Sequence, residues 1–310
     1  MMHFIPTNLE IDFLKISKPY IIASTVAMFL TIIGFFTVGV NYGIDFTGGA
    51  EVTVQVPKDW DIGKLRSTIE QGGLHNASVV QIGTDAELPQ FLVKIQAKPE
   101  ELSKISEDVE KILTATNSGA QILKSDVVGP SAGDRLKRSA LLSLFYAALG
   151  ILIYITLRFD LRFAPGIVRA LLFDVILVVG VWILLRKEFT LSTVAALLTI
   201  AGYSCNDTIV IYDRIREYTK MHPDWSLERA INRSINLNLE RTITTTLATC
   251  LVVTSLWLLG GPVLADFAFA MLVGFLLAVF STLFLANPMV LWMEKRRLAR
   301  QQGLRPSSAT

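Results

Sequence analysis

The sequence has few of the residues, and none of several short patterns, on which metal and nucleotide chemistry depend. Its 310 residues include two cysteines and three histidines, and the histidines are far apart. Cys205 and Cys250 both lie in apolar segments, which is typical of small core residues rather than of a disulfide or a metal site. No CxxC, HExxH or GxxxxGK[ST] pattern is present. We therefore predict no metal, no cofactor and no catalytic residue.

Charge is also scarce, and this points to a class of protein. Only 18% of the residues are charged, 52% are hydrophobic, and the mean hydropathy is +0.48. These values are too apolar for a soluble α/β domain of this length and indicate a membrane protein. The formal net charge of +2 and the lack of a basic run with interleaved aromatic residues argue against nucleic-acid binding.

Six apolar stretches are long enough to cross a bilayer, whose hydrocarbon layer of ~30 Å requires about 20 helical residues. The first could instead be a cleaved signal peptide, but it is long for such a segment and no small-residue cleavage pattern follows it. We predict six transmembrane helices, over about Pro19–Val40, Ala140–Leu157, Ala164–Leu185, Leu191–Ile211, Ile243–Leu259 and Leu264–Trp292.

The distribution of lysine and arginine predicts the orientation. Basic residues gather before the first span, between the second and third, between the fourth and fifth, and after the sixth. On the opposite side, the two short turns hold only Arg186 and Lys187. Because cytoplasmic loops carry the excess of positive charge, we predict that both termini, 1–18 and 293–310, are cytoplasmic.

One segment, residues 41–138, has the sequence pattern of a soluble domain. It lies between the first span (19–40) and the remaining five (139–292). Alternating and amphipathic patterns predict strands and helices in the order β-α-β-β-α-β, over 50–56, 60–73, 78–83, 90–96, 99–116 and 120–128. This order predicts a ferredoxin-like α+β domain outside the cytoplasm.

Asp207 is the most informative single residue, because it lies about one turn inside the predicted cytoplasmic end of the fourth span. An ionised carboxylate in hydrocarbon costs ~2.5–3.5 kcal/mol, so it usually faces a partner or a hydrated cavity, although a residue this close to the interface could simply reach the headgroups. Arg241, predicted to open the fifth helix at a similar depth, is the candidate ion-pair partner. A carboxylate whose pairing changes can bind and release a proton. This predicts a proton switch, against the alternative that the polar residues around the pair only pack helices.

Three further features have two interpretations each. Asp174, near the middle of the third span, could be a proton relay or a packing residue. Gly48 and Gly49 after the first span could form a hinge between membrane and domain, or an ordinary connection. The same choice applies to Gly129 and Pro130 before the second span.

Four segments, taken in order, resemble a known family. They are DFTGG after the first span, VGPSAGDRL before the second, GYSCNDTIVIYDRIRE through the fourth and SINLNLERTITTTLAT entering the fifth. Together they resemble the SecF branch of the SecD/SecF family of bacterial protein-export membrane proteins, within the resistance-nodulation-division superfamily. The resemblance extends from about Ile11 to Trp292.

This resemblance implies an auxiliary, non-enzymatic subunit of the Sec translocase in the bacterial inner membrane. It would work with SecD, a second six-helix protein, beside the SecYEG channel, and would use proton motive force to promote preprotein translocation. By motif position it implies that Asp207 and Arg241 are proton-pathway residues, with Asn206 and Thr208 as neighbours. Two other functions stay open: a half-size exporter of small molecules or lipids, and a passive scaffold for translocase assembly.

This sequence departs from the family pattern near two of these sites. Phe173 stands where a histidine is expected before Asp174, which puts a proton role for Asp174 in doubt. Asn238 and Glu240 replace smaller hydroxyl residues near Arg241, and the extra carboxylate could compete with Asp207.

Overall fold

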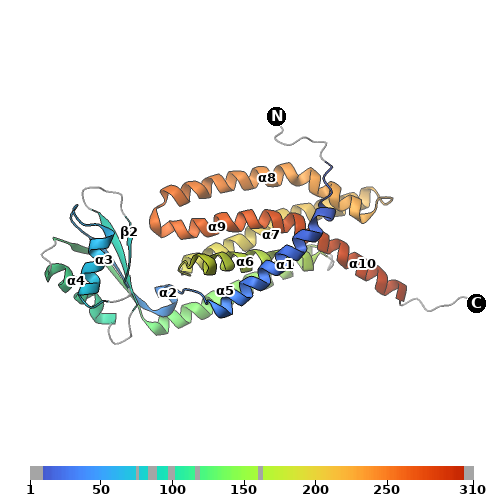
Figure 1. The fold of residues 1–310 in the computed structure, drawn as a ribbon. Coiled ribbons are helices and arrows are strands. Elements are labelled where there is room, and N and C mark those ends of the chain that lie inside the picture. The colour runs from blue at the N-terminus through green and yellow to red at the C-terminus, as the bar shows by residue number, and fades with distance from the viewer. Residues whose placement is uncertain are drawn as a thin grey trace, which may run out of the picture.

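The computed structural model describes residues 10–74, 77–82, 89–96, 102–115, 119–159 and 163–303. Residues 1–9 and 304–310, which belong to the predicted cytoplasmic termini, lie outside the described residues. The described chain forms a bundle of long helices with a small sheet domain at one end (Figure 1). The start of α1 and the end of α10 both lie at the opposite end of the bundle.

The sheet domain has the predicted order of elements and the predicted ferredoxin-like topology. Its four antiparallel strands are arranged β2-β3-β1-β4. Apolar side chains of the strands and of both helices share one core, so the helices cover one face of the sheet. The elements are α2 (Ile44–Thr47), β1 (Gly49–Gln55), α3 (Ile62–Gln71), β2 (Ala77–Gln81), β3 (Gln90–Ile95), α4 (Leu102–Ala115) and β4 (Gln121–Val128).

Six helices of the described chain are long and apolar enough to cross a membrane. This agrees with the predicted fold class, a polytopic helical membrane protein with one inserted α+β domain. The helices are α1 (Phe13–Thr37), α5 (Pro130–Arg158), α6 (Ala164–Leu185), α7 (Leu191–Met221), α8 (Leu227–Leu259), and the continuous sixth span formed by α9 (Gly261–Ser281), η1 (Thr282–Ala286) and α10 (Asn287–Gly303).

The prediction that Arg241 opens the fifth helix is wrong. Helix α7 continues to Met221 and α8 already begins at Leu227, so Arg241 lies in the middle of α8 rather than at its start. The extensions are helical because apolar residues recur on one face, and Ile215 of α7 and Ile231 of α8 belong to one buried cluster. The charges in this region lie on the other faces of two helices.

The last span contains one turn of π-helix, η1, between α9 and α10. A π-turn disturbs the regular backbone hydrogen bonds, and side chains satisfy two of its carbonyl groups here. The Tyr212 hydroxyl of α7 donates to the Ala286 carbonyl at 3.0 Å, and the Asn287 amide donates to the Thr282 carbonyl at 2.7 Å. The π-turn is thereby fixed against α7.

Candidate functional site

Asp207 lies on the side of α7 that faces α8. It is 8% exposed, and its carboxylate interacts electrostatically with the Arg241 guanidinium and lies beside the side chain of Thr242. Arg241 itself is exposed. Among the described residues the two charges do not form a direct ion pair within 4.0 Å. The two residues are thus neighbours across the α7–α8 contact, and small movements of these helices can change how strongly they interact.

A second polar contact joins the same two helices. The Tyr203 hydroxyl of α7 donates to the Thr246 hydroxyl of α8 at 3.2 Å. Tyr203 and Thr246 each lie four residues from Asp207 and Thr242, so this contact is one helical turn from them. The α7–α8 contact therefore presents a polar face around the carboxylate.

The residues on either side of Asp207 point elsewhere. Thr208 is 1% exposed, donates to the Ser204 carbonyl at 3.1 Å and shares a 2.9 Å hydrogen bond with the Thr282 hydroxyl of η1. Asn206 is exposed. The structure thus brings Asp207 and Arg241 together, whereas Thr208 and Asn206 belong to other faces of α7.

Asp174 is fully buried in the helix bundle, in a polar cluster that the sequence reasoning missed. Its Oδ2 accepts hydrogen bonds from the Ser204 hydroxyl at 2.5 Å and from the Ser281 hydroxyl at 3.0 Å. Its Oδ1 has no hydrogen-bond partner within the described part of the chain. Because Ser204 and Thr208 are one turn apart on α7, the polar contacts continue from Asp174 to Thr282. Single hydroxyl residues such as Ser281 and Thr282 are common in apolar helices, so the sequence held no distinct signal for this cluster.

The four predicted hinge residues occupy two short connections. Gly48 ends α2 with φ 79°, and a Cβ on Gly49 would lie 2.6 Å from the Ile95 carbonyl oxygen. Both positions thus require glycine for backbone geometry and close packing. Gly129 is the N-cap of α5, and Pro130 is its first residue, so β4 passes directly into the helix.

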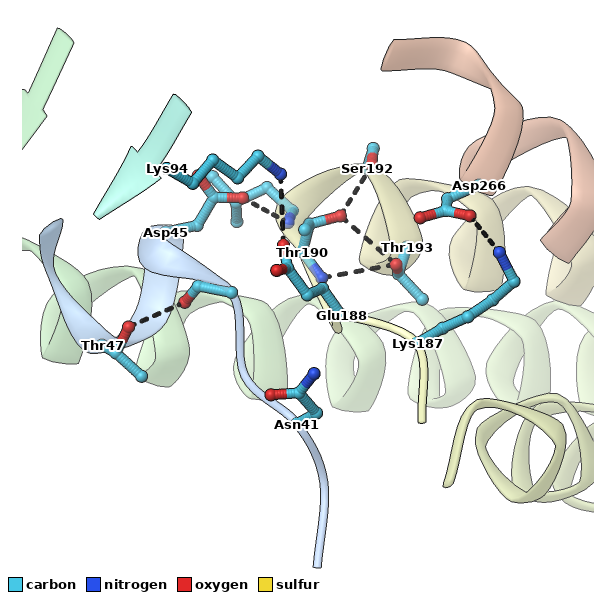
Figure 2. A network of polar contacts seen from close by, with 12 residues as sticks. Asn41, Asp45, Thr47, Lys94, Lys187, Glu188, Thr190, Ser192, Thr193 and Asp266 are labelled. Atoms are coloured by element: carbon cyan, nitrogen blue, oxygen red, sulfur yellow. Dashed lines mark hydrogen bonds and ion pairs between the residues drawn. The ribbon is translucent and has the colours of Figure 1, made fainter. Parts of the chain in front are cut away.

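The N-terminal end of α7 is in contact with the base of the sheet domain. The loop between α6 and α7 carries Glu188, which pairs with Lys94 of β3, and the first amide of α7 donates to the Asp45 carboxylate. Figure 2 shows this network together with the ion pair between Lys187 and Asp266, which ties the same loop to α9. The helix that carries Asp207 is therefore in direct contact with the sheet domain.

Two regions of the chain match descriptions of one protein family. Residues 108–296 match the family described as "Protein export membrane protein SecD/SecF, C-terminal", and residues 33–56 match the "SecD/SecF GG Motif". The chain belongs to the SecD/SecF family. The first match contains Asp174, Asp207 and Arg241, and the second contains Gly48 and Gly49.

Individual relatives of the SecD/SecF family align over almost the whole chain. The protein translocase subunit SecF of Magnetococcus marinus is 39% identical over 298 residues, which cover 94% of this chain and 95% of that protein. The subunit SecDF of Thermus thermophilus is 36% identical over 286 residues, which cover 91% of this chain but 38% of that protein. This chain thus corresponds to SecF and to one part of SecDF.

A solved structure from the SecD/SecF family shows the same fold. The crystal structure of SecDF from Thermus thermophilus, described as a translocon-associated membrane protein, superposes with a TM-score of 0.80 at 34% identity. The superposition covers 94% of this chain and 40% of that one. The protein is accordingly a multi-pass bacterial membrane protein of this family.

Proposed function

We propose that the protein is an auxiliary subunit of the Sec translocase that uses proton motive force, together with a SecD partner, to promote preprotein translocation beside the SecYEG channel. It lies in the cytoplasmic membrane with both termini on the cytoplasmic side and the sheet domain outside. Its relatives are named protein translocase subunits, and those named SecDF carry the matching region within a longer chain. Here a separate SecD chain would supply the part that SecDF carries in addition to the matching region.

The placement of Asp207 beside Arg241 is the observation that carries the proposal. A nearly buried carboxylate next to an exposed guanidinium, without a direct ion pair, can take up a proton when α7 and α8 move apart and release it when they approach. Moving one charge through 100 mV releases ~2.3 kcal/mol, enough to bias a two-state movement of helices. Asp174 is proposed only as a relay or packing residue of secondary importance.

The glycine connections complete the proposed cycle. The sheet domain joins the bundle through Gly48 and Gly49 at one connection and through Gly129 and Pro130 at the other. Bending there would let the domain follow a shift of the helices and pull or hold the emerging preprotein.

Replacement of Asp207 by asparagine tests the proposal, with Asp213→Asn as the matched control. Asp213 lies on the same helix but is exposed and pairs with Arg158 at 3.1 Å, a surface contact worth about 0–1 kcal/mol. Preprotein translocation into membrane vesicles is measured with and without an ionophore, and assembly by copurification with SecD and SecYEG. Asp207→Asn should assemble but lose the stimulation by proton motive force, whereas Asp213→Asn should keep it.

The same experiment separates the alternatives. A passive assembly scaffold would keep stimulated export in the Asp207→Asn variant. A half-size exporter of small molecules or lipids would leave preprotein export unchanged when the wild-type chain is removed. Either result rejects the proposed function.

A further inference from the structure

The base of the sheet domain is docked on the loop that begins α7. On the domain side are the segment 41–47, which includes α2, and Lys94 of β3. On the membrane side are residues 186–191, between α6 and α7. Figure 2 shows the side chains of Asp45, Lys94, Glu188 and Thr190 close together beside the start of α7. We refer to these contacts as the docking contact.

Backbone hydrogen bonds form the first layer of the docking contact. The Phe189 amide donates to the Asn41 carbonyl at 2.7 Å, and the Gly43 amide donates to the Phe189 carbonyl at 2.9 Å. These bonds make Tyr42 and Phe189 a parallel bridge between the two segments. A Cβ on Gly43 would lie 2.9 Å from the Thr190 methyl group, so the two segments lie closer together than any residue but glycine would allow at this position. The contact is therefore specific in register.

Charged groups form the second layer. The Lys94 ammonium pairs with the Glu188 carboxylate at 3.2 Å, and both side chains are partly buried. The Asp45 carboxylate accepts a hydrogen bond at 2.9 Å from the amide of Leu191, the first residue of α7. An acidic group at a helix N-terminus also interacts favourably with the helix dipole. The domain thus supplies a cap for α7 from outside that helix.

The position of α7 gives the docking contact a role. The same helix carries Asp207, and its Ser204 and Thr208 connect it to Asp174 and η1. A helix with continuous backbone hydrogen bonds moves as a stiff rod, so a shift near Asp207 reaches its outer end. There the docking contact converts the shift into a movement of β3 and α2.

We propose that the docking contact is the element that couples protonation at the α7–α8 contact to the sheet domain, with Lys94, Glu188 and Asp45 as its positioning residues. The inference rests on the proposed function, because proton motive force supplies the movement. In this arrangement the segment 41–47, which precedes Gly48 and Gly49, moves with the start of α7, and the pair Lys94–Glu188 carries the movement across that glycine connection to β3.

Charge reversal tests the pair in the assembled translocase. Lys94→Glu places two carboxylates together and Glu188→Lys places two ammonium groups together, whereas the double variant restores opposite charges. Each single variant should lose the part of preprotein export that depends on proton motive force, and the double variant should regain most of it. The matched control is Lys64→Glu with Asp59→Lys, a 3.0 Å pair that lies wholly within the sheet domain. The control variants should keep stimulated export.

Proton flux gives the readout that a merely structural defect would not produce. In proteoliposomes with SecD, the single variants should still conduct protons, since Asp207 and Arg241 are unchanged, while export is lost. Loss of both activities, or stimulated export in both single variants, overturns the inference. Where a single variant does not accumulate, Asp45→Ala and Asp45→Asn give the same comparison, because only asparagine can still accept the Leu191 hydrogen bond. Equal export in these two variants overturns it as well.

The Asp207→Asn variant in the same assays separates the two hypotheses. If Asp207→Asn keeps stimulated export, the proposed function fails. If it loses stimulated export while the charge-reversed single variants keep it, the docking inference alone fails.

Discussion

Gly166 of α6 packs directly against α7 and the π-turn, and its replacement by alanine gives a quantitative test of this packing. A Cβ at this position would overlap the Tyr212 hydroxyl and lie 2.5 Å from the Ala286 carbonyl oxygen, the two groups that share the hydrogen bond securing η1. Displacing the tyrosine leaves a buried carbonyl unsatisfied, at a cost of about 1–3 kcal/mol, and overpacking costs about 1–3 kcal/mol more. Alanine regains about 1 kcal/mol of helix propensity. The net loss is about 1–5 kcal/mol.

Thermal unfolding in detergent measures this effect. For a protein of this size each kcal/mol shifts the Tm by roughly 2–4 °C, so Gly166→Ala should lower the Tm by at least about 2 °C. Gly150→Ala is the matched control, since Gly150 lies in α5 and, among the described residues, the added Cβ would meet no atom of another segment within 4 Å. Its Tm should stay the same or rise. An unchanged Tm for Gly166→Ala would refute the packing described for the π-turn.

Two further predictions concern the sheet domain and the N-terminal segment. Burial raises the pKa of the Glu51 carboxyl, although Lys94 opposes the shift. The folded state therefore holds the carboxyl proton more tightly than the unfolded state does. The stability that this proton contributes is lost as the pH rises through the folded pKa. Glu51→Gln should remove this loss of stability at high pH. Above the folded pKa of Glu51, the β1 amides of the variant should exchange hydrogen more slowly than those of the wild type, and faster exchange would contradict the prediction. The Asn236 side chain accepts from the Ile11 amide at 3.1 Å and donates to its carbonyl at 2.9 Å, so Asn236→Ala should cost about 1–3 kcal/mol locally. Limited proteolysis should become faster ahead of α1, and an unchanged rate would argue against this anchor.

The fold class could be predicted because its signals are local. Long apolar runs mark the helices whatever they pack against, and alternation marks the strands of the sheet domain. The start of α8 was missed for a physical reason. Its first turns, from Leu227 to Arg241, lie beyond the apolar run and carry charges on their exposed faces, so that hydropathy alone suggests a loop.

The polar contacts could be predicted only in part. Asp207 and Arg241 stand out because a charge within or beside an apolar run is costly. Ser204, Ser281 and Thr282 do not stand out, because hydroxyl residues are common in transmembrane helices and only tertiary packing places them around Asp174. The pair Lys94 and Glu188 was missed for the same reason, since its members are far apart in the chain and ordinary when considered singly.

Proton flux through Asp207 is the central claim, and a dye-based measurement in proteoliposomes tests it most directly. Vesicles that contain this chain and SecD are given a pH gradient, and uptake is compared between the wild type, Asp207→Asn and the control Asp213→Asn. The account predicts uptake in the wild type and the control and none in Asp207→Asn. Equal uptake in Asp207→Asn and the wild type would contradict it.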